Sequence, residues 1–260
     1  DAYVNDAFGA SHRAHASIVG PPKHLPSAAG RLLHKEVEVL SAMLERPRRP
    51  FVAVMGGSKV SDKLAVMEAL LENVDSIIVG GGMCFTFLKA QGHSIGASLC
   101  EDEMVETCAR LLEQPKPIHL PYDITAMGPG GKLFDPSVDA DVRQMGVNLP
   151  DGWMGVDIGP GSAAQFGDVI HEAGTVLWNG PMGVFEDPRF GGGTGAVAHA
   201  MAQTKAYTIV GGGDSAAAAK VFGVEKDMDH VSTGGGASLE LIEKGDLPGL
   251  EALRGALSNG

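Results

Sequence analysis

The feature that most constrains this chain is a repeated pairing of a short apolar run with a cluster of glycines. Four such units occur, at residues 51–57, 76–82, 207–213 and 230–236. A buried strand that ends in glycine and passes into a helix brings bare backbone N–H groups to one edge of a sheet. Because a helix N-terminus favours negative charge, the four units together indicate a fold that holds phosphate groups.

Composition limits the classes of partner. The chain has 260 residues, enough for one large domain or two small ones, and 44% of them are hydrophobic. Its formal net charge of −12 argues against nucleic acid or an anionic membrane as the main partner, but not against small phosphorylated ligands. The three cysteines, Cys84, Cys100 and Cys108, show no CxxC spacing, so we expect no disulfide framework and a cytoplasmic location.

Short apolar runs alternate with helical periodicity along most of the chain. Strands are predicted at residues 51–55, 76–79, 118–124, 175–178, 207–210 and 230–232. Helices are predicted at residues 61–74, with Ser61 as the cap, and at 83–90, 101–113, 165–172, 196–203, 215–222 and 237–243. Residues 126–151, rich in Gly, Pro and Asp, are expected to form a loop. The predicted fold class is α/β: a doubly wound, mainly parallel sheet with helices on both faces (Rossmann-like), preceded by an interdomain helix.

Proline-rich breaks divide the chain. Residues 21–50 contain a helical pattern between prolines and are predicted to be a proline-flanked interdomain helix. Residues 1–20 precede it, an α/β domain is expected over 51–240, and 241–260 form a C-terminal tail. Because the chain starts at Asp1 in what reads like the middle of a domain, we expect it to be a fragment.

Two lysines follow the first glycine pair, at the end of the predicted strand 51–55. Lys59 and Lys63 stand four residues apart, so both ammonium groups can lie on the ligand side of a helix that begins near Val60. One lysine could contact a phosphoryl group in transfer and the other a nucleotide phosphate. The GxxxxGK[ST] pattern of a P-loop is absent. The alternative is a strand-to-helix turn with two solvated lysines.

Two later glycine clusters repeat the phosphate-binding pattern. At residues 211–215 glycine amides could hold an anion while Asp214 ligates Mg²⁺, although Asp214 could equally be a simple helix cap. Residues 233–238 form either a second anion cradle or a tight turn. At residues 178–186, Glu186 could accept hydrogen bonds from a ribose while Pro181 and Val184 line an adenine slot. The alternative there is a rigid loop with an exposed glutamate.

Two other patterns are weaker evidence for a binding site. Residues 191–196 fit the GxGxxA dinucleotide fingerprint but do not follow a predicted strand, so we interpret the match as a coincidence of glycine abundance. His12 and His15 are too few to indicate a metal site. Arg13, beside His12, better suits a phosphate or carboxylate of a small substrate, with a solvated polar loop as the alternative.

Taken together, these segments resemble the phosphoglycerate kinase family. The matching runs occur in family order at residues 3–9, 12–15, 56–63, 80–89, 152–157, 178–186, 211–214 and 232–241. The resemblance implies a two-lobed kinase of glycolysis that exchanges phosphoryl between 1,3-bisphosphoglycerate and ADP, giving 3-phosphoglycerate and ATP with Mg²⁺. It also implies a monomer whose C-terminal lobe holds the nucleotide.

The resemblance also implies site residues. The catalytic residues would be Lys59, Gly212 and Gly213. The nucleotide-binding residues would be Gly57, Lys63, Gly81, Gly82, Val156, Asn179, Pro181, Val184, Glu186, Asp214, Ser215, Gly234, Gly235 and Gly236. Asp214 would hold the metal, and His12 and Arg13 would bind the phosphoglycerate.

This chain differs from the family in that most of the N-terminal lobe is missing from it. Most of the family's N-terminal lobe, with its substrate-binding basic patch and catalytic arginine, would precede residues 1–20, which match only the end of that lobe. We therefore expect this chain to bind Mg-ADP or Mg-ATP with negligible turnover. Residues 247–260 are expected to lack the surface on which the C-terminal tail docks in the family. The alternatives are a non-catalytic nucleotide-binding module and a Rossmann dehydrogenase, and the latter lacks its fingerprint in the required context.

Overall fold

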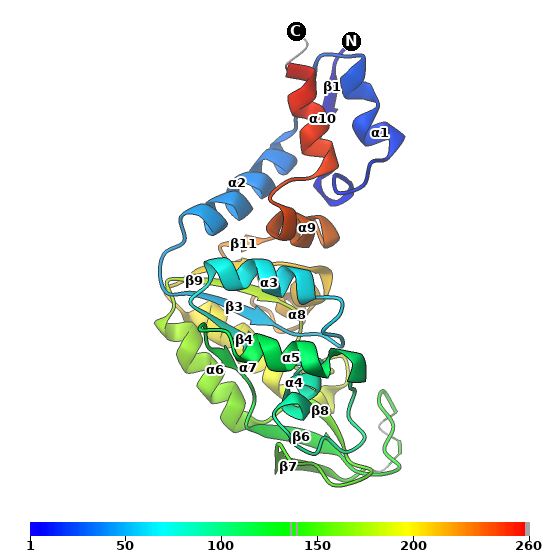
Figure 1. Cartoon of the computed structure of the whole chain (residues 1–260), viewed down its shortest axis with the longest axis vertical. Helices are drawn as coiled ribbons and strands as arrows, with labels where there is room; N and C mark the ends of the chain where they lie inside the picture. Colours follow the sequence, from blue (N-terminus) through cyan, green and yellow to red (C-terminus); the bar gives the residue numbers. More distant parts are fainter. Residues whose placement is uncertain (136, 139, 258–260) are drawn as a thin grey trace.

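The computed structural model describes residues 1–135, 137–138 and 140–257. Figure 1 shows an elongated molecule whose N- and C-terminal segments lie together at one end, above a domain of sheets and helices. The long helix α2 (Arg31–Glu45) runs from the terminal segments to that domain. No helix in the described ranges is both long and apolar enough to span a membrane.

The central sheet contains the predicted strands. Its described strands are β3 (Phe51–Met55), β4 (Ser76–Val79), β5 (Ile118–His119), β9 (Thr175–Asn179), β10 (Tyr207–Val210) and β11 (His230–Val231). They lie in the order β11-β10-β9-β3-β4-β5, and every neighbouring pair is parallel. The chain winds outward from the adjacent strands β3 and β9 in both directions. A crevice for a ligand is therefore expected beyond the carboxyl ends of these two strands.

Helices cover both faces because successive strand residues point to opposite sides. On β3, the side chains of Phe51, Ala53 and Met55 join one core cluster, and those of Val52 and Val54 join another. The first cluster includes residues of α3 (Leu64–Asn73), α4 (Cys84–Ala90), α5 (Val105–Leu112) and α9 (Gly236–Lys244). The second includes residues of α6 (Pro160–Glu172), α7 (Gly192–Gln203) and α8 (Gly213–Val221). This arrangement confirms the predicted doubly wound α/β fold.

A second sheet was not predicted. The strands β6 (Asp123–Met127), β7 (Val142–Gly146) and β8 (Met154–Ile158) pair antiparallel in the order β7-β6-β8. The single strand expected at 118–124 is therefore wrong, because β5 ends at His119 and β6 belongs to another sheet. The loop expected at 126–151 is wrong in part, because it contains β7. Most side chains of β7 are exposed, so this strand has no apolar alternation that would reveal it.

Four helices start at least three residues from their predicted positions, and one of them is α5, which starts at Val105 after the 3-10 turn Asp102–Met104. Ser61 does not cap α3, which begins at Leu64, and its hydroxyl donates to the carboxylate of Glu101 instead. The helix α6 starts at Pro160, because proline suits the first helical position. The helix α7 starts at Gly192, so the glycine run that looks like a helix breaker is helical. A Cβ at Gly193 would lie 2.4 Å from Asp157 Oδ1, so this run allows close packing against β8.

The terminal segments pack on each other. The short strands β1 (Tyr3–Asn5) and β2 (Ser27–Ala29) are parallel, and α1 (Ala16–Val19) lies between them in sequence. The helix α10 (Pro248–Leu257) contacts α1 and β2, and Gly249 N donates to Ser11 O over 2.9 Å. The expectation that the tail lacks a docking surface is therefore wrong for residues 248–257. Residues 258–260 of the expected tail lie outside the described residues.

The helix α2 is tied to the sheet by a buried carboxylate. Glu36, which is 1% exposed, accepts hydrogen bonds from His230 Nε2 (2.9 Å), Thr233 N (2.7 Å) and Thr233 Oγ1 (2.8 Å). Burial opposes ionisation of Glu36, but the hydrogen bonds from His230, Thr233 and Ser232 outweigh it and lower its pKa. This contact joins the long helix to the turn that starts α9.

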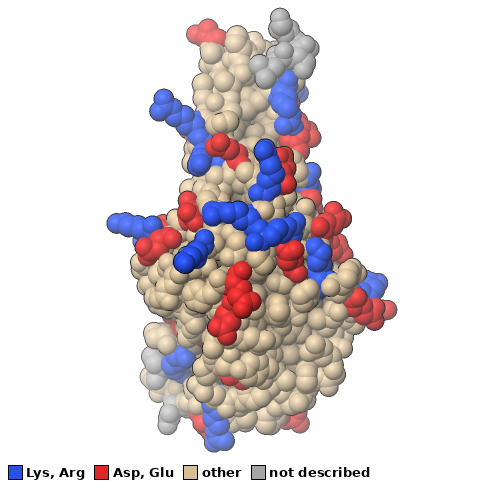
Figure 2. Space-filling view, turned by 90° about the vertical axis from the view of Figure 1, so that its left-hand side faces the viewer, with Lys and Arg blue, Asp and Glu red and all other residues tan. Residues whose placement is uncertain are grey.

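Charges of both signs share the surface. Figure 2 shows Lys and Arg side chains interspersed with Asp and Glu in a band across the middle of one face. Large areas of the lower half of that face carry neither sign. The net charge of −12 is therefore not gathered there into one acidic patch.

Asp157 joins the second sheet to α7. It is 4% exposed, and its carboxylate accepts hydrogen bonds from Gly193 N (2.7 Å) and Ile158 N (2.9 Å). Burial raises the pKa of Asp157 to about 7, although the two backbone hydrogen bonds counteract it. Since an unfolded aspartate ionises near pH 4, the folded protein holds a proton that the unfolded chain releases between about pH 4 and 7.

This raised pKa predicts a specific pH dependence. The contribution of Asp157 to the free energy of unfolding falls as pH rises from about 4 to 7, by at most about 4 kcal/mol. Asp157→Asn carries no such penalty, so its free energy of unfolding should improve relative to wild type between pH 5 and pH 8. Urea denaturation at both pH values measures this, with Asp168→Asn, an exposed aspartate of α6, as the control. A difference between Asp157→Asn and wild type that does not change with pH would contradict the assignment.

Candidate functional site

The carboxyl ends of β3, β9 and β4 meet in a close contact of backbones. Gly56 N donates to Asn179 O (2.9 Å), Gly57 N to Pro181 O (3.1 Å) and Gly81 N to Met182 O (2.9 Å). A Cβ at Gly56 would lie 2.1 Å from Pro181 O, so no larger residue fits there. The glycine clusters therefore form a fixed backbone floor at the crevice expected from the strand order.

A cavity of about 350 Å³ opens on this floor, and we call it the apolar cavity. Its side chains include Phe85, Leu99, Met154, Val156 and Val184. The predicted site residues that line it are Gly57, Gly81, Gly82, Val156, Pro181, Val184, Glu186 and Asp214. A flat apolar group with a polar attachment at its edge would suit these walls.

A second cavity of about 190 Å³ lies beside the first, and we call it the polar cavity. The predicted site residues that line it are Lys63, Asn179, Gly212, Gly213, Asp214, Ser215, Gly235 and Gly236. Because Asp214 lines both cavities, they are adjacent. Gly180 and Leu239 complete the lining.

Two helix N-termini contribute to the polar cavity. Gly212 precedes α8 and Gly235 precedes α9, and neither helix has a side-chain cap. Gly212 has φ of +92°, and a Cβ there would lie 2.9 Å from Asn179 Nδ2. The first N–H groups of a helix have no partner within it, and they carry partial positive charge. The polar cavity is therefore suited to an anion.

Lys63 supplies the formal positive charge of the polar cavity. Its Nζ donates to Asn179 Oδ1, and Asn179 Nδ2 donates in turn to Gly211 O over 2.8 Å. Burial lowers the pKa of Lys63, while the charges of Asp214 and then Asp62 act in the opposite direction. Since water solvates this ammonium only in part, an anion that enters the cavity regains an interaction that burial removed.

Four predicted site residues line neither cavity. Lys59 is exposed in the loop before α3. Burial raises the pKa of Glu101, but the hydrogen bonds from Ser61 and Val60 and the charge of Lys59 outweigh it and lower that pKa. Gly234 is buried, and a Cβ there would lie 2.2 Å from Phe8 Cε1. His12 lies beside α9, 3.4 Å from the Cβ position of Gly236, and Arg13 is exposed. The roles of these four residues stay predictions.

Sequence reasoning missed part of the apolar cavity. The residues that it did not name are Ser58, Phe85, Leu99, Leu133, Phe134, Met154, Gly155 and Gly183. Leu133 and Phe134 come from the segment between β6 and β7, which was expected to be plain loop. Phe134 and Leu99 are large apolar residues that are 64% and 57% exposed. Exposure is visible only in the folded chain, so no sequence pattern marks them.

The side chains available as metal ligands limit which metal ion could bind. Among the described residues, no group of three or more His, Cys, Asp or Glu side chains could hold a metal ion. Asp214 offers a single exposed carboxylate at the junction of the two cavities. Mg²⁺ commonly binds through one or two carboxylates together with substrate phosphates. The residues therefore fit a Mg²⁺ that arrives with a polyphosphate, and not a metal held by protein alone.

A larger cavity lies elsewhere. A space of about 720 Å³ opens between α6, α7 and the second sheet, with the small residues Ala163, Gly167 and Ala196 and also Asp157 in its wall. None of the glycine-terminated strand ends contributes to it. Volume alone therefore does not identify the functional site of this chain.

Comparison with known proteins finds similar sequences over nearly all of this chain. A family model described as phosphoglycerate kinase matches residues 1–245. A phosphoglycerate kinase of Salinispora tropica is 56% identical over 256 residues, and one of Rhodococcus jostii is 50% identical over 260 residues. These matches cover 97% and 98% of this chain but 63% of each relative, so the chain spans less than two thirds of their length.

Solved structures of phosphoglycerate kinases also match this chain. The structure of phosphoglycerate kinase from Coxiella burnetii matches all of this chain and 66% of its own, with a TM-score of 0.92 and 42% sequence identity. The crystal structure of phosphoglycerate kinase from Pyrococcus horikoshii also matches all of this chain and 65% of its own. Its TM-score is 0.85 and its sequence identity 30%.

The place of Lys63 in the polar cavity predicts an effect on anion binding that an exposed lysine elsewhere should not have. Lys63→Ala should lower the affinity for pyrophosphate in the presence of Mg²⁺ by about tenfold or more, because it removes the ammonium of the polar cavity. Lys226→Ala is the matched control, because this exposed lysine of the turn Glu225–Asp227 lines neither cavity, and it should change that affinity by less than about twofold. Isothermal titration calorimetry on both variants measures the difference. Equal losses for the two lysines would argue against the polar cavity as the anion site.

Proposed function

The chain belongs to the phosphoglycerate kinase family, and on that premise we propose that it supplies the nucleotide-binding part of a phosphotransferase. The proposed reaction moves a phosphoryl group between 1,3-bisphosphoglycerate and ADP, giving 3-phosphoglycerate and ATP. The observation that carries the proposal is the pair of cavities joined at Asp214. One suits a base, the other suits phosphates, and they lie in the order in which a nucleotide presents these groups.

Each cavity takes one part of the nucleotide. The adenine occupies the apolar cavity between Pro181, Val156 and Val184, and the carboxylate of Glu186 accepts hydrogen bonds from the ribose. Lys63 and the backbone amides of Gly212 and Gly213 hold the phosphates, opposite the α9 N-terminus at Gly235 and Gly236. Gly57, Gly81 and Gly82 form the floor.

Two buried side chains, Ser215 and Asn179, keep the phosphate-binding groups of the site in place. Ser215 Oγ accepts a hydrogen bond from Gly180 N over 2.5 Å, which joins the start of α8 to the end of β9. Asn179 orients Lys63 through its Oδ1 atom. Such fixed donors stabilise charge that develops during phosphoryl transfer without having to reorganise.

Mg²⁺ is the proposed metal. Asp214 would hold it, and the ion would neutralise charge on the nucleotide phosphates. The support for this assignment is the place of Asp214 at the junction of the two cavities, with a single carboxylate available. Lys63 lies close enough to Asp214 for the carboxylate to counteract the lowering of its pKa.

The other half of the site concerns the phosphoglycerate. We assign its binding to His12 and Arg13, and the neutralisation of the phosphoryl group in transfer to Lys59. Support for His12 comes from its Nδ1 atom, which is buried and has no hydrogen-bond partner among the described residues. Gly234 keeps its proposed role at the turn before α9, where only a glycine fits against Phe8.

The proposed division of the chain follows from these roles. Residues 1–20 belong to the substrate side, 21–50 form the interdomain helix, 51–240 bind the nucleotide and 241–260 form the tail. We also assign the protein to the cytoplasm, as a monomer. The division of the chain rests on the family and on the glycine-lined cavities within 51–240, whereas the location and the monomeric state rest on the family alone.

The first test is binding of the nucleotide. Wild type should bind Mg-ADP, and Asp214→Ala should weaken that binding by about tenfold because it removes the carboxylate ligand of Mg²⁺. The loss should vanish or reverse in EDTA, since Asp214 then only repels the phosphates. Titration calorimetry with and without the metal measures both effects, with NAD as the negative control. Wild type that binds NAD, or that does not bind Mg-ADP, would overturn the proposed function.

The second test is turnover. The 260-residue chain by itself should be slower than a full-length family member by at least about 10³-fold, because an arginine that neutralises transition-state charge is worth about 10³–10⁵ in rate. A coupled assay of ATP formation, with the enzyme from Salinispora tropica as the reference, measures the ratio. Turnover near that of the reference would refute the proposal that this chain binds nucleotide without efficient transfer.

A further inference from the structure

A buried ion pair fastens the segment after β6 to the turn after Glu186. Asp187 is 2% exposed, and Arg189 is 23% exposed in the short 3-10 turn η4 (Pro188–Phe190). Arg189 Nε donates to Asp187 Oδ1 over 2.9 Å, and Arg189 Nη2 donates to Asp187 Oδ2 over 2.6 Å. Two parallel bonds of this kind fix the guanidinium and the carboxylate in one plane. We call Asp187 and Arg189 the clamp.

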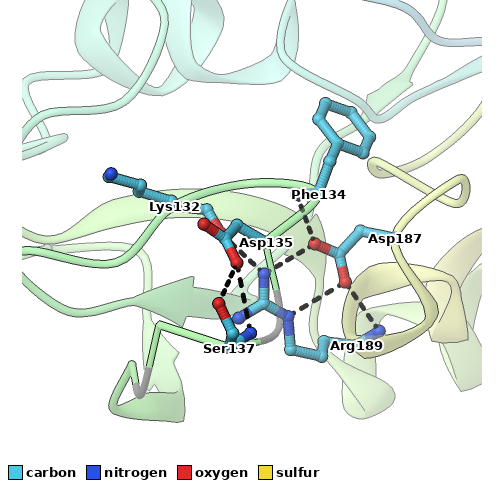
Figure 3. Close-up of polar contacts among 6 residues, drawn as sticks. All are labelled: Lys132, Phe134, Asp135, Ser137, Asp187 and Arg189. Atoms are coloured by element: carbon cyan, nitrogen blue, oxygen red, sulfur yellow. Dashed lines mark hydrogen bonds and ion pairs between the residues drawn. The ribbon is translucent and has the colours of Figure 1, made fainter.

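Both members of the clamp also bind the backbone of residues 132–134. Asp187 Oδ2 accepts from Phe134 N over 2.9 Å, and Arg189 Nη2 donates to Lys132 O over 2.7 Å. Figure 3 shows the segment that carries Lys132 and Phe134 beside the clamp, with dashed lines for these contacts. The hydrogen bonds from Arg189 lower the pKa of Asp187 far below its usual range, and burial opposes them. The carboxylate therefore stays ionised, and the clamp stays closed, at physiological pH.

Phe134 needs such a restraint. Its φ is +61°, and it is the only residue other than glycine with a positive φ in the described ranges. This conformation is unfavourable for an L-residue with a large side chain and persists only where surrounding contacts impose it. The ring of Phe134 is largely exposed, so core packing does not explain the restraint.

The restrained segment forms one wall of the apolar cavity. Leu133 and Phe134 line it from this side, while Val184 and Glu186 line it from the segment that leads into the clamp. The clamp therefore joins two walls of one cavity that are about fifty residues apart in sequence. Neither Asp187 nor Arg189 lines the cavity itself.

We propose that Asp187 and Arg189 are positioning residues that hold Leu133 and Phe134 as a wall of the base site, so that the clamp sets the affinity for the nucleotide base without contacting the phosphates. This inference rests on the proposed nucleotide site. An aromatic ring that contacts a base contributes substantially to binding only when it is already held in place, because otherwise ordering the segment offsets the gain.

The test separates the base from the phosphates. The probes are ADP and pyrophosphate, each with Mg²⁺ and measured by titration calorimetry. Arg189→Ala and Phe134→Ala should each lower ADP affinity by about tenfold and change pyrophosphate affinity by less than about twofold. The double variant should bind ADP no more weakly than the weaker single variant, because Arg189 acts through Phe134. Arg143→Ala, which removes another arginine of the β6–β7 region and its ion pair with Asp141, should leave both affinities unchanged.

The outcomes are distinguishable. Equal losses for ADP and pyrophosphate in Arg189→Ala would mean a general structural role and would overturn the inference, as would unchanged ADP affinity. Arg189→Lys, which keeps the charge but not the paired bonds, should fold and still lose ADP affinity selectively. Phe134→Ala removes an exposed ring, so it should fold, and ADP affinity like that of wild type would also overturn the inference. Failure of wild type to bind ADP at all would instead overturn the proposed function.

Discussion

The site depends on the close approach of two strand ends, β3 and β9, at the centre of the sheet. Gly56 and Gly180 lie so close there that a Cβ on Gly180 would come within 2.3 Å of Gly56 O. Because neither residue has a side chain, the backbones join directly and the chain leaves both strands toward the same edge. Lys63 follows one strand and Asn179 ends the other, so the hydrogen bond between them depends on this approach. Both cavities then form around the same floor.

An acidic protein can still attract polyanions where positive charge is local. The protein carries a net charge of −12, whereas the polar cavity gathers two helix N-termini and one partly buried ammonium. Solvent screens the partial charges of fixed backbone amides less in such a cavity than on an open surface. These amides also need no reorganisation when a ligand binds. The clamp of Asp187 and Arg189 plays a different part at the apolar cavity. It uses ionised groups outside the cavity to fix the backbone of uncharged residues that line it.

The sequence predicted the central sheet well and the second sheet poorly, for a physical reason. Strands such as β3 are buried on both faces, so their residues form continuous apolar runs that end in glycine. The exposed strand β7 has no such pattern, and β6 follows Pro121 too closely to be separated from β5 by composition. The start of α7 was missed because its glycines resemble a helix breaker, while in the fold they allow close contact with β8. Most of the predicted site residues line the two cavities, but Lys59 and Gly234 line neither although they belong to glycine motifs, and His12 and Arg13 also line neither.

The sequence by itself determined the class of fold, the glycine-terminated strand ends at which the two cavities open and the family to which the chain belongs. These properties follow from local patterns, since hydrophobic periodicity, glycine positions and short motifs depend on neighbouring residues. Only the tertiary structure decided which residues share a cavity. It brought Phe134 and Leu133 to the site from a segment with no recognisable pattern, and it paired Glu36 with His230 and Thr233 across almost two hundred residues. Such contacts depend on how distant segments pack, and no local pattern encodes the distance between them.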